Sequence, residues 1–290
     1  MRGIATKTLK IIHDNGEEFM LLDTPTEYLC GPWFGFYCQD KFHVFKNCDK
    51  DNPYTLMNLK AGKSVNRLTV EYRKFSKKKA DIGDEEAPVP DIKAQFFADV
   101  YYSKNELNCV FFYSIKNNCS LEFKDIRLFN LFDFDIGGLS NYDCDYAYFD
   151  EEYNAIVQND GTVHVGFCSL EEFPAAHHQA GHPYEIKIDA SSPSLNDMVL
   201  KGPDDFFSGL EWDLGDLAPG QYKIVPVVLA AGDSREEFYY FLRDGMEKAR
   251  KILPTMPRII MQSERQKFLT SDGLVEKMNK ALKGNGEKEC

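Results

Sequence analysis

The sequence predicts a mainly β protein, a large antiparallel two-sheet sandwich followed by C-terminal α-helices. Aromatic residues make up 13% of the 290 residues, and these side chains favour the half-buried surface of a pleated sheet. Short apolar runs alternate with turn residues before residue 233, which is typical of an antiparallel sandwich. After residue 233 the apolar spacing changes to the period of a helix.

The first part of the β region contains two hairpin patterns and one longer alternating run. Asp14-Asn15-Gly16 separates the first pair of apolar stretches, and Gln39-Asp40-Lys41 separates the second. A charged segment at residues 76–91 ends in Ala-Pro-Val-Pro, and it is either a linker between subdomains or a long surface loop. The strands expected before this break are residues 4–12, 19–22, 33–38, 42–45 and 64–75.

The strongest strand patterns follow the break. Asn159-Asp160-Gly161 marks a tight hairpin turn. Within residues 121–136, five alternating positions are expected to face one way, namely Ile126, Leu128, Asn130, Phe132 and Phe134. The strands expected in this part are residues 92–102, 107–115, 121–136, 146–149, 155–158, 162–168, 206–214 and 222–230.

Two amphipathic helices are expected at the C-terminal end. Ser234 followed by Glu237 forms a capping box, and apolar residues then recur at helical spacing until Pro254. A second amphipathic run covers residues 264–282. We therefore expect a sandwich domain at residues 1–232 and a helical segment at residues 233–290.

Charge and motifs exclude several functions. The net charge of −12 argues against binding to duplex nucleic acid, which needs Lys and Arg at the phosphates. No apolar run suits a leader peptide or a membrane span, so we expect a cytoplasmic protein with no membrane partner. None of the eight cysteines forms a C-x-x-C pair, which favours reduced thiols. Phosphate-binding loops, a nucleophile elbow and kinase motifs are also lacking.

Three of the six histidines lie within six residues, at His177, His178 and His182. Nearby Pro and Gly residues predict a loop between Cys168 and a strand near Tyr184. Imidazoles bind transition metals well, so these histidines are candidates for a divalent metal or ligand site. The alternative is a loop whose histidines form local hydrogen bonds. No other cofactor is expected.

Acidic and aromatic residues gather at a second place, in residues 133–148. Asp133, Asp135, Asp143 and Asp145, with the neighbouring tyrosines, could bind calcium, hold sugar hydroxyls or form a solvated strand edge. The two tryptophans could stack on sugar rings or pack in the core. The candidate ligand-binding residues are Trp33, Asp145, Tyr146, Tyr148 and Trp212.

Residues 130–138, 145–158 and 210–221, the last with the Val-Leu-Ala-Ala-Gly run that ends at Gly232, resemble a known domain. They are similar to the N-terminal β-sandwich of prokaryotic glucoamylases of glycoside hydrolase family 15, over about residues 92–253. The resemblance implies a galactose-mutarotase-like supersandwich fold. In that family a catalytic (α/α)₆ barrel follows and carries the catalytic carboxylates. Only 37 residues follow Leu253 here, so we expect a stand-alone sandwich without that barrel.

Three functions remain open. The sequence favours a non-catalytic module that binds a carbohydrate or a protein. An alternative is a mutarotase-like or metal-dependent sugar-modifying enzyme, in which a histidine works with Glu185 or Asp145 as acid and base. A third is an assembly protein whose C-terminal helices bind a partner or a second copy of the chain. The catalytic candidates are His164, His177, His178, His182 and Glu185.

Overall fold

The computed structural model describes most of the region that carries the predicted sandwich. It covers residues 8–12, 18–23, 31–46, 54–61, 65–74, 92–103, 106–137, 141–182 and 184–256. The chain divides into two compact units, Met1–Ala249 and Arg250–Cys290, and the first unit holds all of the described strands.

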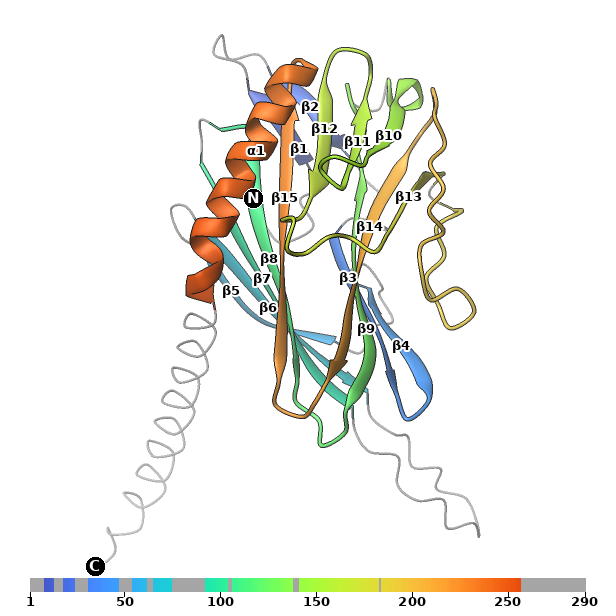
Figure 1. Ribbon diagram of the computed structural model, residues 1–290, viewed down its shortest axis with the longest axis vertical. Coiled ribbons are helices and arrows are strands. Elements are labelled where there is room, and N and C mark those ends of the chain that lie inside the picture. The colour runs from blue at the N-terminus through green and yellow to red at the C-terminus, as the bar shows by residue number, and fades with distance from the viewer. Residues whose placement is uncertain are drawn as a thin grey trace, which may run out of the picture. The chain divides into compact units, whose positions relative to one another are not determined.

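Two antiparallel sheets form the body of the first unit, and β1 and β2 pair as a separate hairpin (Figure 1). The larger sheet has eight strands in the order β10-β11-β12-β15-β8-β7-β6-β5, and the smaller has five in the order β13-β14-β9-β3-β4. The prediction of an antiparallel two-sheet sandwich is therefore confirmed. The strands are β1 Thr8–Ile12, β2 Glu18–Asp23, β3 Gly31–Cys38, β4 Lys41–Lys46, β5 Tyr54–Ala61, β6 Val65–Lys74, β7 Ile92–Tyr102, β8 Asn108–Asn117, β9 Phe123–Asp133, β10 Tyr146–Asp150, β11 Ala155–Asn159, β12 His164–Cys168, β13 His177–Gly181, β14 Phe207–Leu217 and β15 Tyr222–Gly232.

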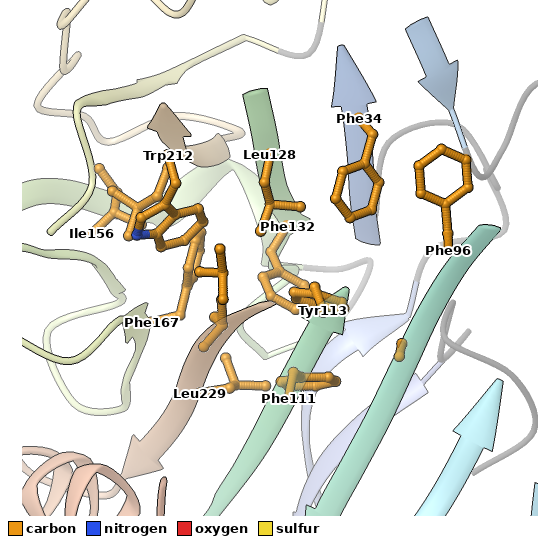
Figure 2. Packing of buried hydrophobic residues seen from close by; sticks show 14 of the residues in the cluster. Phe34, Phe96, Phe111, Tyr113, Leu128, Phe132, Ile156, Phe167, Trp212 and Leu229 are labelled. Atoms are coloured by element: carbon orange, nitrogen blue, oxygen red, sulfur yellow. The ribbon is translucent and has the colours of Figure 1, made fainter. Parts of the chain in front are cut away.

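The core lies between the two sheets and is rich in aromatic rings (Figure 2). Phe34 of β3 stacks on Phe96 of β7, with ring centroids 4.6 Å apart. Phe132 of β9 meets Phe167 of β12 edge to face at 5.1 Å. Each pair joins one sheet to the other, so the inner faces pack directly together. The predicted alternation in residues 126–134 holds, because its apolar members belong to this core.

Further layers cover the outer faces. Helix α1, Arg235–Ile252, lies along β15 (Figure 1), and Asn108 of β8 donates to the carbonyl of Phe241 at 2.9 Å. On the smaller sheet, residues 186–195 bring three apolar side chains onto Trp33, Phe129, Leu131 and Phe207. Burial on both faces explains the nearly continuous apolar run in β3 and the five successive buried residues at 128–132 in β9.

Most local predictions are confirmed, and some are wrong. The capping box forms, because Glu237 N–H donates to Ser234 Oγ at 3.2 Å and Glu237 Oε2 accepts from Asp233 N–H at 2.7 Å. Strand β5 was not predicted. The predicted loop around His177 and His178 is instead strand β13, which pairs with β14, and Tyr184 lies in a turn and not beside a strand.

Parts of the sequence prediction lie outside the described residues. These are the charged segment at 76–91 and the second helix at 264–282. Of the cysteines in the described region, Cys38, Cys109 and Cys168 are buried. None of the described helices has the length and apolar character that a membrane crossing requires.

Candidate ligand-binding site

Strand β13 places two neighbouring histidines at the edge of the smaller sheet, opposite one carboxylate. His177 pairs with Glu211 and His178 with Leu210 in the β13–β14 ladder. His177 Nδ1 lies 2.8 Å from Asp197 Oδ2, and Asp197 Oδ1 accepts the backbone N–H of His178 at 3.0 Å. The segment after β13 thus returns to the strand and is held there by Asp197.

The two imidazoles have different electrostatic surroundings. The hydrogen bond to Asp197 raises the pKa of His177, whereas burial lowers the pKa of His178. The ring of His178 stacks on Phe149 of β10, with centroids 3.7 Å apart and an interplanar angle of 3°. Of these two partly buried imidazoles, His178 therefore loses a proton more readily and His177 gains one more readily.

Just after β13, His182 forms a second pair with a carboxylate. Its Nε2 lies 3.1 Å from Asp204 Oδ2. On the other side its ring lies nearly parallel to that of Tyr184, at 5.1 Å and 8°. Tyr184 is 72% exposed. We call His182, Tyr184 and Asp204 the tyrosine face, because together they present an open ring beside an imidazole that contacts a carboxylate.

Asp204 is held in place by the backbone next to Asp145. Asp204 N–H donates to the carbonyl of Asp145 at 3.0 Å. Gly202 approaches the same carbonyl so closely that an added Cβ would lie 2.3 Å from the oxygen, and its φ of +91° also requires glycine. The turn that carries Asp204 is therefore fixed against the start of β10.

Three carboxylates converge behind this turn, and the carboxylate of Asp145 is near two of them, Asp135 and Asp205. Carboxylate oxygens of Asp133, Asp135 and Asp205 lie within 4.8 Å of one another. Asp145 is 0% exposed, and its Oδ2 accepts the N–H of Ile136 at 3.4 Å. We call these residues the four-aspartate cluster.

Crowding and burial perturb the carboxyl groups of this cluster. Burial, together with the charges of Asp135 and Asp205, raises the pKa of Asp133 to about 7. Burial, with smaller contributions from Asp135 and Asp205, raises the pKa of Asp145 to about 8, against the hydrogen bond from Ile136. At neutral pH the cluster therefore holds protons as well as negative charge.

The three histidines do not form the most compact set of metal-binding groups. In the described part of the chain, one group of three metal-binding side chains is close enough to share an ion. It consists of Asp133, Asp135 and Asp205. The histidines are instead divided between Asp197 and Asp204. A metal site on His177, His178 and His182 stays a prediction that this geometry does not favour.

The other predicted residues lie on several different elements. His164 Nδ1 lies 3.2 Å from the carbonyl oxygen of Thr162, which accepts from it, and β12 pairs His164 with Gly232 in the larger sheet, whereas β13 belongs to the smaller sheet. Tyr148 lies 3.3 Å from the hydroxyl of Tyr239 on α1. Tyr146 alternates with buried Ala147 and is therefore directed to the same face of β10 as Tyr148. Glu185 is exposed, and its N–H donates to the carbonyl of His182 at 2.9 Å.

Both tryptophans belong to the interior, as the core-packing interpretation predicted. Each is 2% exposed. Trp33 lies under residues 186–195, and Trp212 Nε1 donates to the carbonyl of Phe173 at 2.9 Å. An exposed platform on either ring, the alternative interpretation, is wrong for this fold, because the covering segment removes Trp33 from solvent.

Three residues of the site, Asp197, Asp204 and Asp205, were not predicted from the sequence. Each lies more than 15 residues from its partner histidine or aspartate. Because the chain has 46 acidic residues, no sequence pattern distinguishes these three from the others. Only the return of the chain after β13 brings them to the site. The Asp204-Asp205 pair before a strand was the one local signal available.

Comparison with known proteins gives distant similarities. No protein-family model matches the chain, and no curated protein matches its sequence. Among solved structures, the chain is similar to a bacterial glucoamylase bound to acarbose, with 12% identity, a TM-score of 0.48, and coverage of 79% of this chain and 32% of that one. It is also similar to a polysaccharide lyase, with 11% identity, a TM-score of 0.43, and coverage of 78% and 30%.

A third similar structure is a galactose mutarotase-like protein from Clostridium acetobutylicum, with 11% identity and a TM-score of 0.40. The match covers 78% of this chain and 92% of that one. The chain spans about a third of the length of the glucoamylase and the lyase. The class of the protein, an antiparallel β-sandwich, rests on its own two sheets.

Proposed function

We propose that this protein is a non-catalytic module that binds carbohydrate through the tyrosine face. The observation that carries the proposal is the exposed ring of Tyr184, which lies parallel to His182 while His182 contacts Asp204. An apolar ring face beside oriented polar groups is the combination that suits a sugar, which has apolar C–H faces and many hydroxyl groups.

The contacts that fix this face lower the entropy cost of binding. His182 is held between Tyr184 and Asp204, and the backbone of Asp204 is anchored to Asp145. A carboxylate at this position accepts hydrogen bonds from hydroxyl groups, and bonds to an ionised acceptor are stronger than neutral ones. Because the groups are already ordered, less of the binding free energy is lost in ordering them.

We further propose that the sandwich is of the galactose-mutarotase-like supersandwich type and corresponds to the N-terminal domain of family 15 glucoamylases. This proposal rests on residues 130–138, 145–158 and 210–221, which resemble that domain. In the structure these residues form β9, β10, β11 and β14, which lie in both sheets. Likeness of fold is weaker support for a function than the geometry of a site, so the tyrosine face carries the functional proposal.

One observation favours an enzyme as the second candidate. His178 has a lowered pKa and lies 3.5 Å from Asp197, so it is a neutral base beside a carboxylate. A mutarotase-like enzyme needs such a base together with a proton donor. The mutarotation of glucose and galactose, followed by polarimetry, tests this candidate, and acceleration by the wild type that is lost in His178→Ala would replace the binding module as the proposed function.

The binding proposal is tested with Tyr184→Ala and with Tyr240→Ala as a matched control. Tyr240 is also strongly exposed, but it lies on α1. Calorimetric titration with maltooligosaccharides and galactosides should show binding to the wild type and to Tyr240→Ala. The affinity of Tyr184→Ala should fall about tenfold, which corresponds to about 1.4 kcal/mol. Absence of binding to every sugar, or equal affinities in the two variants, would refute the proposal.

A further inference from the structure

We propose that the four-aspartate cluster is a binding site for one Ca²⁺ ion. Asp133, Asp135, Asp145 and Asp205 come from three separate segments of the chain, which end β9, precede β10 and precede β14. The fold itself therefore assembles these carboxylates. The inference does not depend on sugar binding at the tyrosine face.

The spacing of the carboxylates suits the size of Ca²⁺. The oxygens of Asp133, Asp135 and Asp205 lie within 4.8 Å of one another. Calcium–oxygen distances of about 2.3–2.6 Å place ligands on opposite sides of the ion about 4.6–5.2 Å apart. All donors in the set are oxygens, with no histidine or cysteine, and oxygen donors are the preference of hard cations and not of zinc or copper.

Asp145 provides a second observation that points to a cation at the cluster. Its side chain is completely buried, and no hydrogen-bond donor from any described residue reaches Oδ1. The carboxylate is directed at the Asp135–Ile136 segment, because its Oδ2 accepts the N–H of Ile136. A buried carboxylate oxygen without a donor is costly, and a cation would satisfy it.

A second oxygen in the same region also lacks a donor. Gln158 donates through Nε2 to the carbonyl of Phe206 at 3.2 Å and to Ser208 Oγ at 2.6 Å. Its Oε1 is buried, and within the described residues it accepts no hydrogen bond. Phe206 directly follows Asp205, so Gln158 holds the backbone that is continuous with the cluster. Calcium commonly combines carboxylates with neutral oxygens and water to reach about six to eight ligands.

The cluster has a route to solvent. Asp205 is half-buried, and it precedes the start of β14 directly after Asp204, which belongs to the tyrosine face. An ion could therefore reach the carboxylates from this side.

The test compares the full chain, freed of metal with EDTA, with the same chain titrated with CaCl₂. Calorimetry should show one ion per chain. At a hundredfold excess over Kd, the Tm should rise by about 5 °C. In Asp135→Asn and Asp205→Asn this rise should disappear, while in Glu151→Gln, which removes an exposed carboxylate outside the cluster, it should be kept.

The variants also control for loss of fold. Removing one of several repelling carboxylates should leave the metal-free Tm unchanged or higher, and far-UV circular dichroism should match the wild type. The proposal is overturned if about 10 mM Ca²⁺, well above the dissociation constant of weak extracellular sites, leaves the wild-type Tm unchanged. It is equally overturned if both aspartate variants keep the rise, or if Mg²⁺ raises the Tm and Ca²⁺ does not.

Discussion

Replacement of Glu211 tests how the chain segment that carries the tyrosine face is held to the smaller sheet. Glu211 lies in β14 and is 0% exposed. Its carboxylate accepts the N–H of Leu195 at 2.7 Å and the hydroxyl of Ser194 at 2.8 Å. Arg127 Nη1 lies 3.7 Å from its other oxygen. One side chain thus ties the segment between β13 and β14 to the neighbouring strands.

The magnitude follows from these contacts. A hydrogen bond to a charged group contributes about 1.5–3 kcal/mol, and removing one member of a buried ion pair costs about 3–5 kcal/mol. For Glu211→Ala we therefore expect a loss of about 4 kcal/mol in the free energy of unfolding. At about 2–4 °C per kcal/mol for a domain of this size, the Tm should fall by about 8–16 °C.

Glu211→Gln separates geometry from charge. Burial raises the pKa of Glu211, against the hydrogen bonds from Leu195 and Ser194, so the charge itself is unfavourably placed. Glutamine keeps the volume and can still accept the N–H of Leu195. We therefore expect this variant to lose only about 1 kcal/mol, much less than the alanine variant.

The assay is urea and thermal unfolding followed by circular dichroism, with Asp213→Ala as the control. Asp213 lies two residues further along the same strand but is exposed, so its loss should be within about 0.5 kcal/mol. A loss below about 1 kcal/mol in Glu211→Ala would show that this carboxylate does not anchor the segment. Equal losses in the alanine and glutamine variants would show that charge, and not the hydrogen-bond geometry, is what matters.

Two further predictions concern the turn at Gly202 and the pair formed by His177 and Asp197. Gly202→Ala should cost about 2–3 kcal/mol in thermal unfolding, because its Cβ would clash with the carbonyl of Asp145. Gly220→Ala, with a positive φ but open space around it, should cost only about 1 kcal/mol, and equal costs would contradict the clash. Hydrogen bonding to Asp197 raises the pKa of His177 above 6.5, so the stabilisation from this pair is complete below pH 6.5 and is lost as the pH rises through the folded-state pKa. The difference in stability between wild type and Asp197→Asn should therefore shrink as the pH rises from 6 to 8, and a constant difference would contradict the role of the protonated imidazole.

Most of the β architecture could be predicted because its signals are local. The hairpin turn at Asn159-Asp160-Gly161 joins β11 to β12, as the sequence indicated. The alternation in β9 correctly assigned its inward face, including Asn130, a polar residue that is nevertheless completely buried. The capping box correctly fixed the start of α1.

The candidate site could not be predicted in the same way, because its parts meet only in three dimensions. Strand β13 has five residues and begins with two histidines, so its sequence carries no apolar alternation. It exists because β14, some 30 residues later, offers an edge to pair with. Asp205 joins the four-aspartate cluster by the same long-range return. Sequence spacing could identify Asp133 and Asp145 as candidates, but not the residue that completes their set.

The segment at Met198–Leu200, which lies beside β13, also affects how readily the protein associates with copies of itself. Edge strands can recruit strands from other molecules through unpaired N–H and carbonyl groups. At the middle of β13, Ala180 N–H donates to the carbonyl of Met198 at 2.9 Å, and its own carbonyl accepts from Leu200 N–H at 3.0 Å. The backbone of the chain itself therefore forms hydrogen bonds along this edge of the smaller sheet. The strand at the opposite edge, β4, begins and ends with lysine. Both devices discourage the growth of intermolecular β-sheet at high protein concentration.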